Sequence, residues 1–142
     1  MTPTRPDPER SAVPVSVPGW PPPHGYSDGM SANGRLVVTA GVIGWNPVSH
    51  AIESDNLASQ VAQALRNIMD ILTAAGAESR HVVRLTWYVT NRDEYIAARP
   101  AIGIAYREAM GRHYPVMAVV VVAGLLEPRA KVEIEATAVV PG

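Results

Sequence analysis

The sequence contains no cysteine among its 142 residues. This absence excludes disulfide bridges, thiolate nucleophiles and thiolate metal sites. It is compatible with a reducing compartment, where proteins seldom carry disulfides.

An excess of positive charge is also missing. Lys and Arg number 12 against 13 Asp and Glu, which gives a net charge of −1. Nucleic-acid binding proteins carry a basic patch or stripe, and peripheral membrane proteins often carry a polybasic segment. We therefore expect neither nucleic acid nor a membrane as a partner.

No segment has the pattern of a signal peptide or of a membrane span. Arg5 and Arg10 lie near the N-terminus, but the prolines that follow interrupt any apolar stretch. The longest uncharged apolar run covers residues 115–126, whereas a membrane-spanning helix needs about 20 residues. We expect a cytoplasmic protein.

Proline is concentrated at one end of the chain, with eight of the 13 prolines in residues 1–23. Proline has a fixed φ and no amide donor, so this segment is expected to be an extended arm, anchored by Trp20. Hydrophobic residues make up 47% of the chain and charged residues 18%, as in globular proteins. We predict a Pro-rich arm over residues 1–23 and a single domain over residues 24–142.

Residues 26–40 have the pattern of a β-hairpin. Asn33-Gly34 is the preferred pair for a type I′ turn, which needs φ > 0 at both positions. The residues after this pair are β-branched and apolar, as expected of a strand.

The clearest helix covers residues 56–75, because its apolar residues recur at helical spacing. Ser54, Asp55 or Asn56 can cap its start, and Gly76 follows its end.

Four further elements follow in the second half of the chain. Residues 82–90 predict a strand, and residues 93–110 a helix that Pro100 should kink or restart. Residues 116–122 form an unbroken apolar run, which predicts a strand buried on both faces. Residues 131–140 alternate between polar and apolar side chains and predict a half-buried strand. The predicted order is ββαβαββ.

Two helices can cover only one face of such a sheet. The strand over residues 116–122 requires burial on both faces, so another element must cover the second face. A symmetric partner subunit is the simplest candidate, and we predict a homo-oligomer. The alternative is that a loop or the Pro-rich arm covers that face.

Three short motifs are interpreted as structural. Gly25-Tyr26-Ser27-Asp28-Gly29 matches the G-x-S-x-G nucleophile pattern, but it lacks the strand-to-helix turn on which that pattern depends. The four histidines have no metal-ligand spacing, and the glycines near Gly41 lack the Lys-Ser/Thr of a phosphate loop. We expect no metal and no cofactor.

Glu133 and Glu135 form the one carboxylate pair of interest. Residues i and i+2 of a strand share a face and lie roughly 7 Å apart. Such a pair can hold or activate water, and partial burial would raise the carboxyl pKa values. The alternative is a solvent-facing stripe that continues from Lys131, which periodicity alone favours.

Several segments, taken in order, resemble the RidA (YjgF-like) family over about residues 24–140. The matching features are the helix Gln60-x-x-Gln63-Ala64-Leu65-x-Asn67-Ile68-x-x-x-Leu72-x-Ala74-Ala75-Gly76, the strand over residues 82–90, the ending Val132-Glu133-Ile134-Glu135-Ala136-Thr137-Ala138, the pair Tyr26-Ser27, and Ala40-Gly41 where the family often has Ser-Gly.

The resemblance implies a chorismate-mutase-like α+β fold, with two helices on one face of a mixed sheet. It also implies a homotrimer with pockets between subunits. Members of its best-understood branch hydrolyse reactive enamines or imines to a keto acid and ammonia. In that branch an arginine binds the substrate carboxylate through two hydrogen bonds. A glutamate positions water, and a backbone group after Ser-Gly orients the substrate.

Carried over residue by residue, the resemblance assigns the catalytic glutamate to Glu133 and the tyrosine to Tyr26. The arginine position is occupied by Met117, and a thioether cannot bind a carboxylate through two hydrogen bonds. The pocket should therefore be more apolar than in the deaminase branch. The residues expected to contact substrate are Gly41, Val42, Trp87, Tyr88, Met117 and Ala118.

Three functions remain open on the sequence. The first is an enzyme that processes a small imine or enamine, for which Arg35, Arg84 or Arg129 could supply the lost cation. The second is a non-catalytic trimer that binds a small ligand or a protein. The third is a ribonuclease, which ranks last because no basic patch or catalytic histidine pair supports it.

Overall fold

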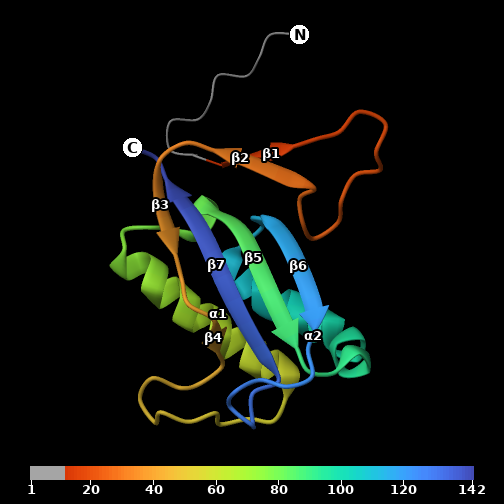
Figure 1. Ribbon diagram of the computed structural model, residues 1–142, viewed down its shortest axis with the longest axis vertical. Coiled ribbons are helices and arrows are strands. Elements are labelled where there is room, and N and C mark those ends of the chain that lie inside the picture. The colour runs from red at the N-terminus through yellow and green to blue at the C-terminus, as the bar shows by residue number, and fades with distance from the viewer. Residues whose placement is uncertain (1–11) are drawn as a thin grey trace.

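A computed structural model describes residues 12–142, which form a mixed sheet with two helices on one face (Figure 1). The five-stranded sheet has the order β3 (Arg35–Val38), β7 (Val132–Val140), β5 (Val82–Val89) and β6 (Val116–Val121). The short strand β4 (Val42–Ile43) also pairs with β7. The predicted fold class is confirmed.

The long strand β7 organises the sheet. It runs antiparallel to β3, β4 and β5, whereas β5 and β6 are parallel. A parallel pair needs a crossover, and here the crossover is the helix α2 (Arg92–Met110). The predicted alternation of β7 is confirmed, because its apolar side chains are buried and Glu133 and Glu135 are only half-buried.

The helix α1 (Leu57–Ala74) begins where the sequence predicts. Asn56 is its N-cap, and the Asn56 side chain accepts a hydrogen bond of 2.9 Å from the amide of Ser59. Gly76 follows the end of the helix with φ of 76°, a conformation that glycine adopts without strain.

The second helix begins at Arg92 after the N-cap Asn91. The helix continues through Pro100 to Met110 without a break, so of the two predicted effects of Pro100, a kink or a restart, the restart is wrong. A short 3₁₀ helix, η1 (Ser79–His81), precedes β5. The core lies between the two helices and one face of the sheet, and its largest fully buried side chains include Trp87, Leu65, Ile68, Leu72 and Leu85.

The predicted hairpin over residues 26–40 is wrong. The strand β2 (Gly29–Ala32) pairs with β1 (Ala12–Val15) in a separate two-stranded ribbon, and β3 pairs with β7 instead. Asn33 does not have the positive φ that a type I′ turn needs. Gly34 has φ of 145°, and a Cβ atom there would lie 2.0 Å from the carbonyl oxygen of Val140. Glycine is therefore required for the close approach of two segments far apart in the sequence.

The N-terminal arm takes part in this ribbon, because β1 lies within it. The predicted anchor Trp20 is 61% exposed in the single chain, so the expected packing of this side chain is wrong. The rest of the predicted arm, residues 1–11, lies outside the described residues.

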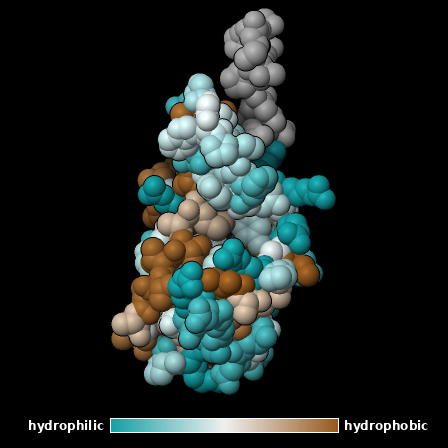
Figure 2. Space-filling model, turned by 90° about the vertical axis from the view of Figure 1, so that its right-hand side faces the viewer, coloured by the Kyte–Doolittle hydropathy of each residue, from teal (hydrophilic) through white to brown (hydrophobic). Residues whose placement is uncertain are grey.

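The second face of the sheet is not covered by a helix (Figure 1). Its central strands present polar side chains, and its edges present apolar ones: Leu36 is 64% exposed, Val38 63% and Val120 41%. The strand β6 lies at the edge of the sheet with one neighbour, so it is not buried on both faces within one chain. Figure 2 shows hydrophobic side chains gathered across the middle of the β6 side of the molecule.

Within residues 12–142, no helix is long and apolar enough to cross a membrane. The same part of the chain has no group of three or more His, Asp or Glu side chains placed to hold a metal ion.

Candidate functional site

Glu133 lies on the uncovered face of the sheet, directly over Gly41. Glu133 pairs with Ile43 of β4, and Gly41 immediately precedes that strand. A Cβ atom on Gly41 would lie 2.7 Å from the Cδ atom of Glu133 and 2.8 Å from its Oε2 atom. The carboxylate thus occupies space that exists only because residue 41 has no side chain.

The neighbouring carboxylate, Glu135, is already engaged. The hydroxyl of Tyr88 donates a hydrogen bond of 2.8 Å to Oε1 of Glu135. This bond stabilises the protonated phenol, and with desolvation it raises the pKa of Tyr88 above its ordinary value. Glu133 makes no side-chain hydrogen bond or ion pair with any other residue in 12–142. Of the two carboxylates, Glu133 is therefore the one available to bind water or a ligand.

Met117 lies on the opposite face of the sheet. It pairs with the buried Leu85 of β5, so both side chains point toward the helices. Met117 lines a cavity of about 520 Å³ between β5, β6, α2 and the segment that carries Tyr26. The apolar and aromatic part of its lining includes Tyr26, Trp87, Tyr95, Tyr106, Met117 and Val119.

Tyr26 is held at this cavity by its neighbour Ser27. The hydroxyl of Ser27 donates a 2.6 Å hydrogen bond to the carbonyl oxygen of Tyr114, and the amide of Ser27 donates to the carbonyl oxygen of Pro115. Ser27 thus fastens the Tyr26 segment to the start of β6. Tyr114 in turn stacks on Tyr106, with ring centroids 5.8 Å apart.

Trp87, which lines the cavity, has a buried donor without an acceptor among residues 12–142. The side chain is 2% exposed, and its indole N–H has no acceptor among residues 12–142. Leaving a buried donor unpaired costs about 1–3 kcal/mol, so such a group calls for a specific explanation.

Two arginines at this cavity were missed by the sequence reasoning. Arg99 and Arg107 of α2 both line it, and both are exposed. The sequence contains one signal for Arg107: Gly103, an unfavourable residue within a helix, lies one turn before it. A Cβ atom on Gly103 would be 3.3 Å from Nη1 of Arg107, so the guanidinium folds back over that glycine.

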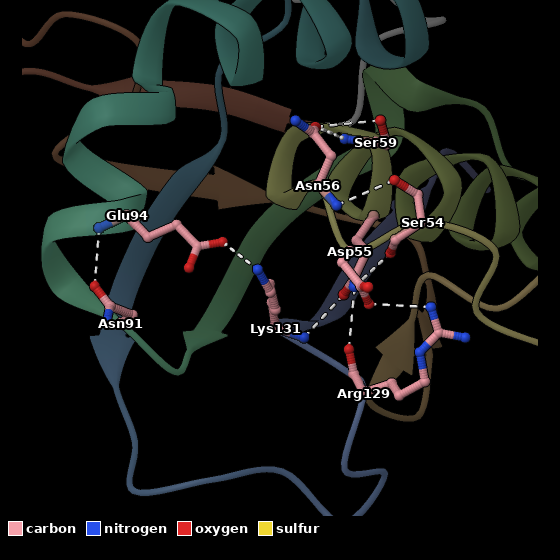
Figure 3. A network of polar contacts seen from close by, with 9 residues as sticks. Ser54, Asp55, Asn56, Ser59, Asn91, Glu94, Arg129 and Lys131 are labelled. Atoms are coloured by element: carbon pink, nitrogen blue, oxygen red, sulfur yellow. Dashed lines mark hydrogen bonds and ion pairs between the residues drawn. The ribbon is translucent and has the colours of Figure 1, made fainter.

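The arginines that the sequence reasoning named as substitutes do not line this cavity, although Arg84 lines a second hollow with Met117 and Tyr26. Arg35 donates to the carbonyl oxygen of Ala75, and Arg84 is exposed on the uncovered face. Arg129 forms an ion pair of 3.0 Å with Asp55 (Figure 3). These three side chains do not line the Met117 cavity.

Arg129 belongs to a polar network that fixes the loop before β7. Lys131 forms an ion pair of 2.8 Å with Glu94 of α2 (Figure 3). Gln60 is 1% exposed, and its amide group donates to the carbonyl oxygens of Ser54 and Arg129 and accepts from the amide of Lys131. This network fixes the position at which β7 begins, and therefore the position of Glu133.

The predicted site residues fall into two groups within one chain. Gly41, Glu133 and Tyr88 belong to the uncovered face, whereas Tyr26, Trp87 and Met117 line the cavity on the helix side.

Met117 and Glu133 are separated by three residues along the strands and by two strand spacings, through Leu85 and Tyr88. The two residues are therefore roughly 10 Å apart along the strand direction and roughly 10 Å apart across the strands.

The remaining two predicted contacts lie between or beneath these groups. Ala118 is exposed and lines a hollow of about 480 Å³ that Tyr26, Arg84 and Met117 also line. Val42 is buried in the core, so only its backbone is available to a ligand.

The described residues have the chorismate-mutase-like α+β fold, a class in which two helices pack on one face of a mixed sheet. The family model described as Endoribonuclease L-PSP matches residues 20–140. The chain therefore belongs to this family, the RidA (YjgF-like) family.

Individual relatives agree with this assignment. The human protein named 2-iminobutanoate/2-iminopropanoate deaminase is 30% identical over 105 residues, which cover 74% of this chain and 73% of the human protein. YyfB from Yersinia pestis, a Rid-family protein of unknown function, is 29% identical with a TM-score of 0.81, over 92% of this chain and 99% of YyfB. Escherichia coli TdcF with bound serine is 27% identical with a TM-score of 0.65, over 89% and 98%.

Proposed function

We propose that this protein hydrolyses a small imine or enamine metabolite in a pocket between the subunits of a homotrimer. The observation that carries the proposal is the carboxylate of Glu133, held over Gly41 and unengaged by other side chains of residues 12–142. Support at the family level comes from relatives named 2-iminobutanoate/2-iminopropanoate deaminase.

The reaction needs one base and one molecule of water. Glu133 accepts a proton from water as the oxygen attacks the imine carbon, and the tetrahedral adduct forms. Glu133 returns this proton to the nitrogen, which gives the neutral amino alcohol. It then accepts the hydroxyl proton of the adduct and passes it to the nitrogen, so that the carbon–nitrogen bond breaks, the carbonyl forms and ammonia leaves. An enamine enters the same path after protonation on carbon gives the imine. General-base assistance of this kind contributes about 10²–10⁴-fold to a rate.

A trimer supplies what one chain lacks. Glu133 and Met117 lie on opposite faces of one sheet, so a single pocket that contains both needs two copies of the chain. The uncovered face has exposed apolar side chains at both edges, Leu36 and Val38 on β3 and Val120 on β6. Burying these side chains against a second copy would be favourable by about 25 cal/mol for each Å² removed from water.

Because of Met117, we expect a substrate that differs from that of the deaminase branch. A thioether offers no charge and no hydrogen-bond donor to a substrate carboxylate. We expect poor hydrolysis of the small imino acids derived from 2-aminoacrylate. A cavity wall of Met117 and Val119 favours a substrate with more apolar surface.

The test compares Glu133→Gln with Glu135→Gln as a matched control on the same strand. Imines are generated in situ from amino acids by an amino-acid oxidase, and their disappearance is followed by trapping with semicarbazide. We expect Glu133→Gln to lose at least about 100-fold in kcat/KM and Glu135→Gln to lose less than about 10-fold. Equal activity of Glu133→Gln and the unmodified protein on every imine tested would refute the enzymatic function.

The second candidate, a non-catalytic trimer that binds a small ligand, is favoured by Met117 in the arginine position. Under that function, Glu133→Ala leaves the behaviour of the protein unchanged. The loss of turnover in a Glu133→Ala trimer distinguishes the enzyme from the binding protein.

A further inference from the structure

The cavity on the helix side of the sheet has a polar rim and an apolar interior. Its volume of about 520 Å³ lies within the range of sites that bury most of a drug-sized ligand. Trp87, Met117 and Val119 supply its sheet wall, and Tyr95 and Tyr106 of α2 supply the opposite wall. A four-carbon acid would leave most of this wall without a contact.

Two cations meet at the rim. Arg99 and Arg107 are two helical turns apart, but the guanidinium of Arg107 lies over Gly103, one turn from each of their Cα positions. Arg99 and Arg107 thus both place positive charge at the rim of the same cavity. Neither has a carboxylate partner among residues 12–142.

Arg99 also acts on the tyrosine one turn before it. Burial raises the pKa of Tyr95, and the positive charge of Arg99 opposes this rise. The charge of Arg99 is therefore felt at the aromatic wall and not only in solvent.

We propose that this cavity binds a carboxylate that carries a bulky aromatic or branched apolar side chain. Arg99 and Arg107 hold the carboxylate, and the aromatic wall with Met117 contacts the side chain. This proposal rests on the proposed function, because it names the substrate class as imino acids larger than those in the names of the relatives. The positive charge that is missing at position 117 is supplied by the two arginines of α2.

The test measures binding to the full chain by isothermal titration calorimetry, without turnover. The probes are phenylpyruvate, 3-phenylpropanoate, 3-phenylpropanamide and 2-oxobutanoate. We expect phenylpyruvate and 3-phenylpropanoate to bind most tightly. The neutral amide and the small 2-oxobutanoate should each bind at least about 10-fold more weakly than phenylpyruvate.

The double variant Arg99→Gln/Arg107→Gln should lose at least about 10-fold in affinity for phenylpyruvate and keep its affinity for the amide. Arg92→Gln serves as the matched control, because Arg92 lies on the same helix, is exposed, and does not line the cavity.

The proposal is overturned if the amide binds as tightly as the acid, if no aromatic acid binds, or if the double variant binds phenylpyruvate as tightly as the control variant. Binding of phenylpyruvate without hydrolysis of any imine would leave this site standing and refute the proposed enzyme. Hydrolysis of 2-iminobutanoate without binding of aromatic acids would do the reverse.

Discussion

A methyl group at residue 41 should disable the site without unfolding the protein. In Gly41→Ala the new Cβ atom would stand 2.7 Å from Cδ and 2.8 Å from Oε2 of Glu133. Carbon atoms make optimal contact at about 3.5–4.0 Å, so the carboxylate must move by about 1 Å. Gly41 does not have a positive φ, so alanine brings no backbone strain, and the Glu133 side chain is free to rotate away.

The expected result is a loss of activity with little change in stability. Misplacing a catalytic group by about 1 Å can cost about 100-fold in rate. The assay is kcat/KM for imine hydrolysis, with the melting temperature measured in parallel. Gly124→Ala is the control, because a Cβ atom there has no neighbour within 4 Å and φ is not positive. A fully active Gly41→Ala protein would refute the assignment of Glu133 as the group that positions water.

Three further predictions concern single residues. Gly103→Ala should raise the free energy of unfolding, measured in urea, by about 0.5–1 kcal/mol, because alanine is favoured within a helix. The same change should weaken phenylpyruvate binding, measured by calorimetry, because the new methyl group displaces Arg107. Stronger binding would contradict the role of Arg107. Gln60→Ala should lower the free energy of unfolding by about 3 kcal/mol, since it removes three hydrogen bonds to partly buried backbone groups; a loss below about 1 kcal/mol in urea unfolding would contradict this account. Met117→Arg should raise kcat/KM for small imino acids, measured by imine trapping, and unchanged or lower activity would count against the reading of Met117.

Much of the fold was predictable because its signals are local. The capped helix α1 and the alternating strand β7 follow from the side chains of consecutive residues, and the structure contains both. The hairpin was not predictable from Asn33-Gly34, because Gly34 is used for a close approach to Val140 at the other end of the chain. A turn signal records a backbone requirement, but it does not say which strands pair.

The candidate site was likewise predictable only in part. Glu133 and Gly41 were predicted through a family resemblance, and their direct contact is visible only in three dimensions. Arg99 and Arg107 were missed because periodicity marks both as solvent-facing positions on a helix, whether or not a cavity lies beside them. Gly103 was the one local sign, since glycine within a helix needs a reason.

The central claim is that one site combines Glu133 from one copy of the chain with the Tyr26 and Met117 cavity of another. Glu133→Gln and Tyr26→Ala proteins, each expected to be inactive alone, are mixed in equal amounts, unfolded, refolded together, and checked for mixed trimers by native mass spectrometry. In random mixed trimers about one quarter of the sites receive both intact halves, so about one quarter of the unmodified activity should return. Mixed trimers that stay as inactive as the two parent variants would contradict the account.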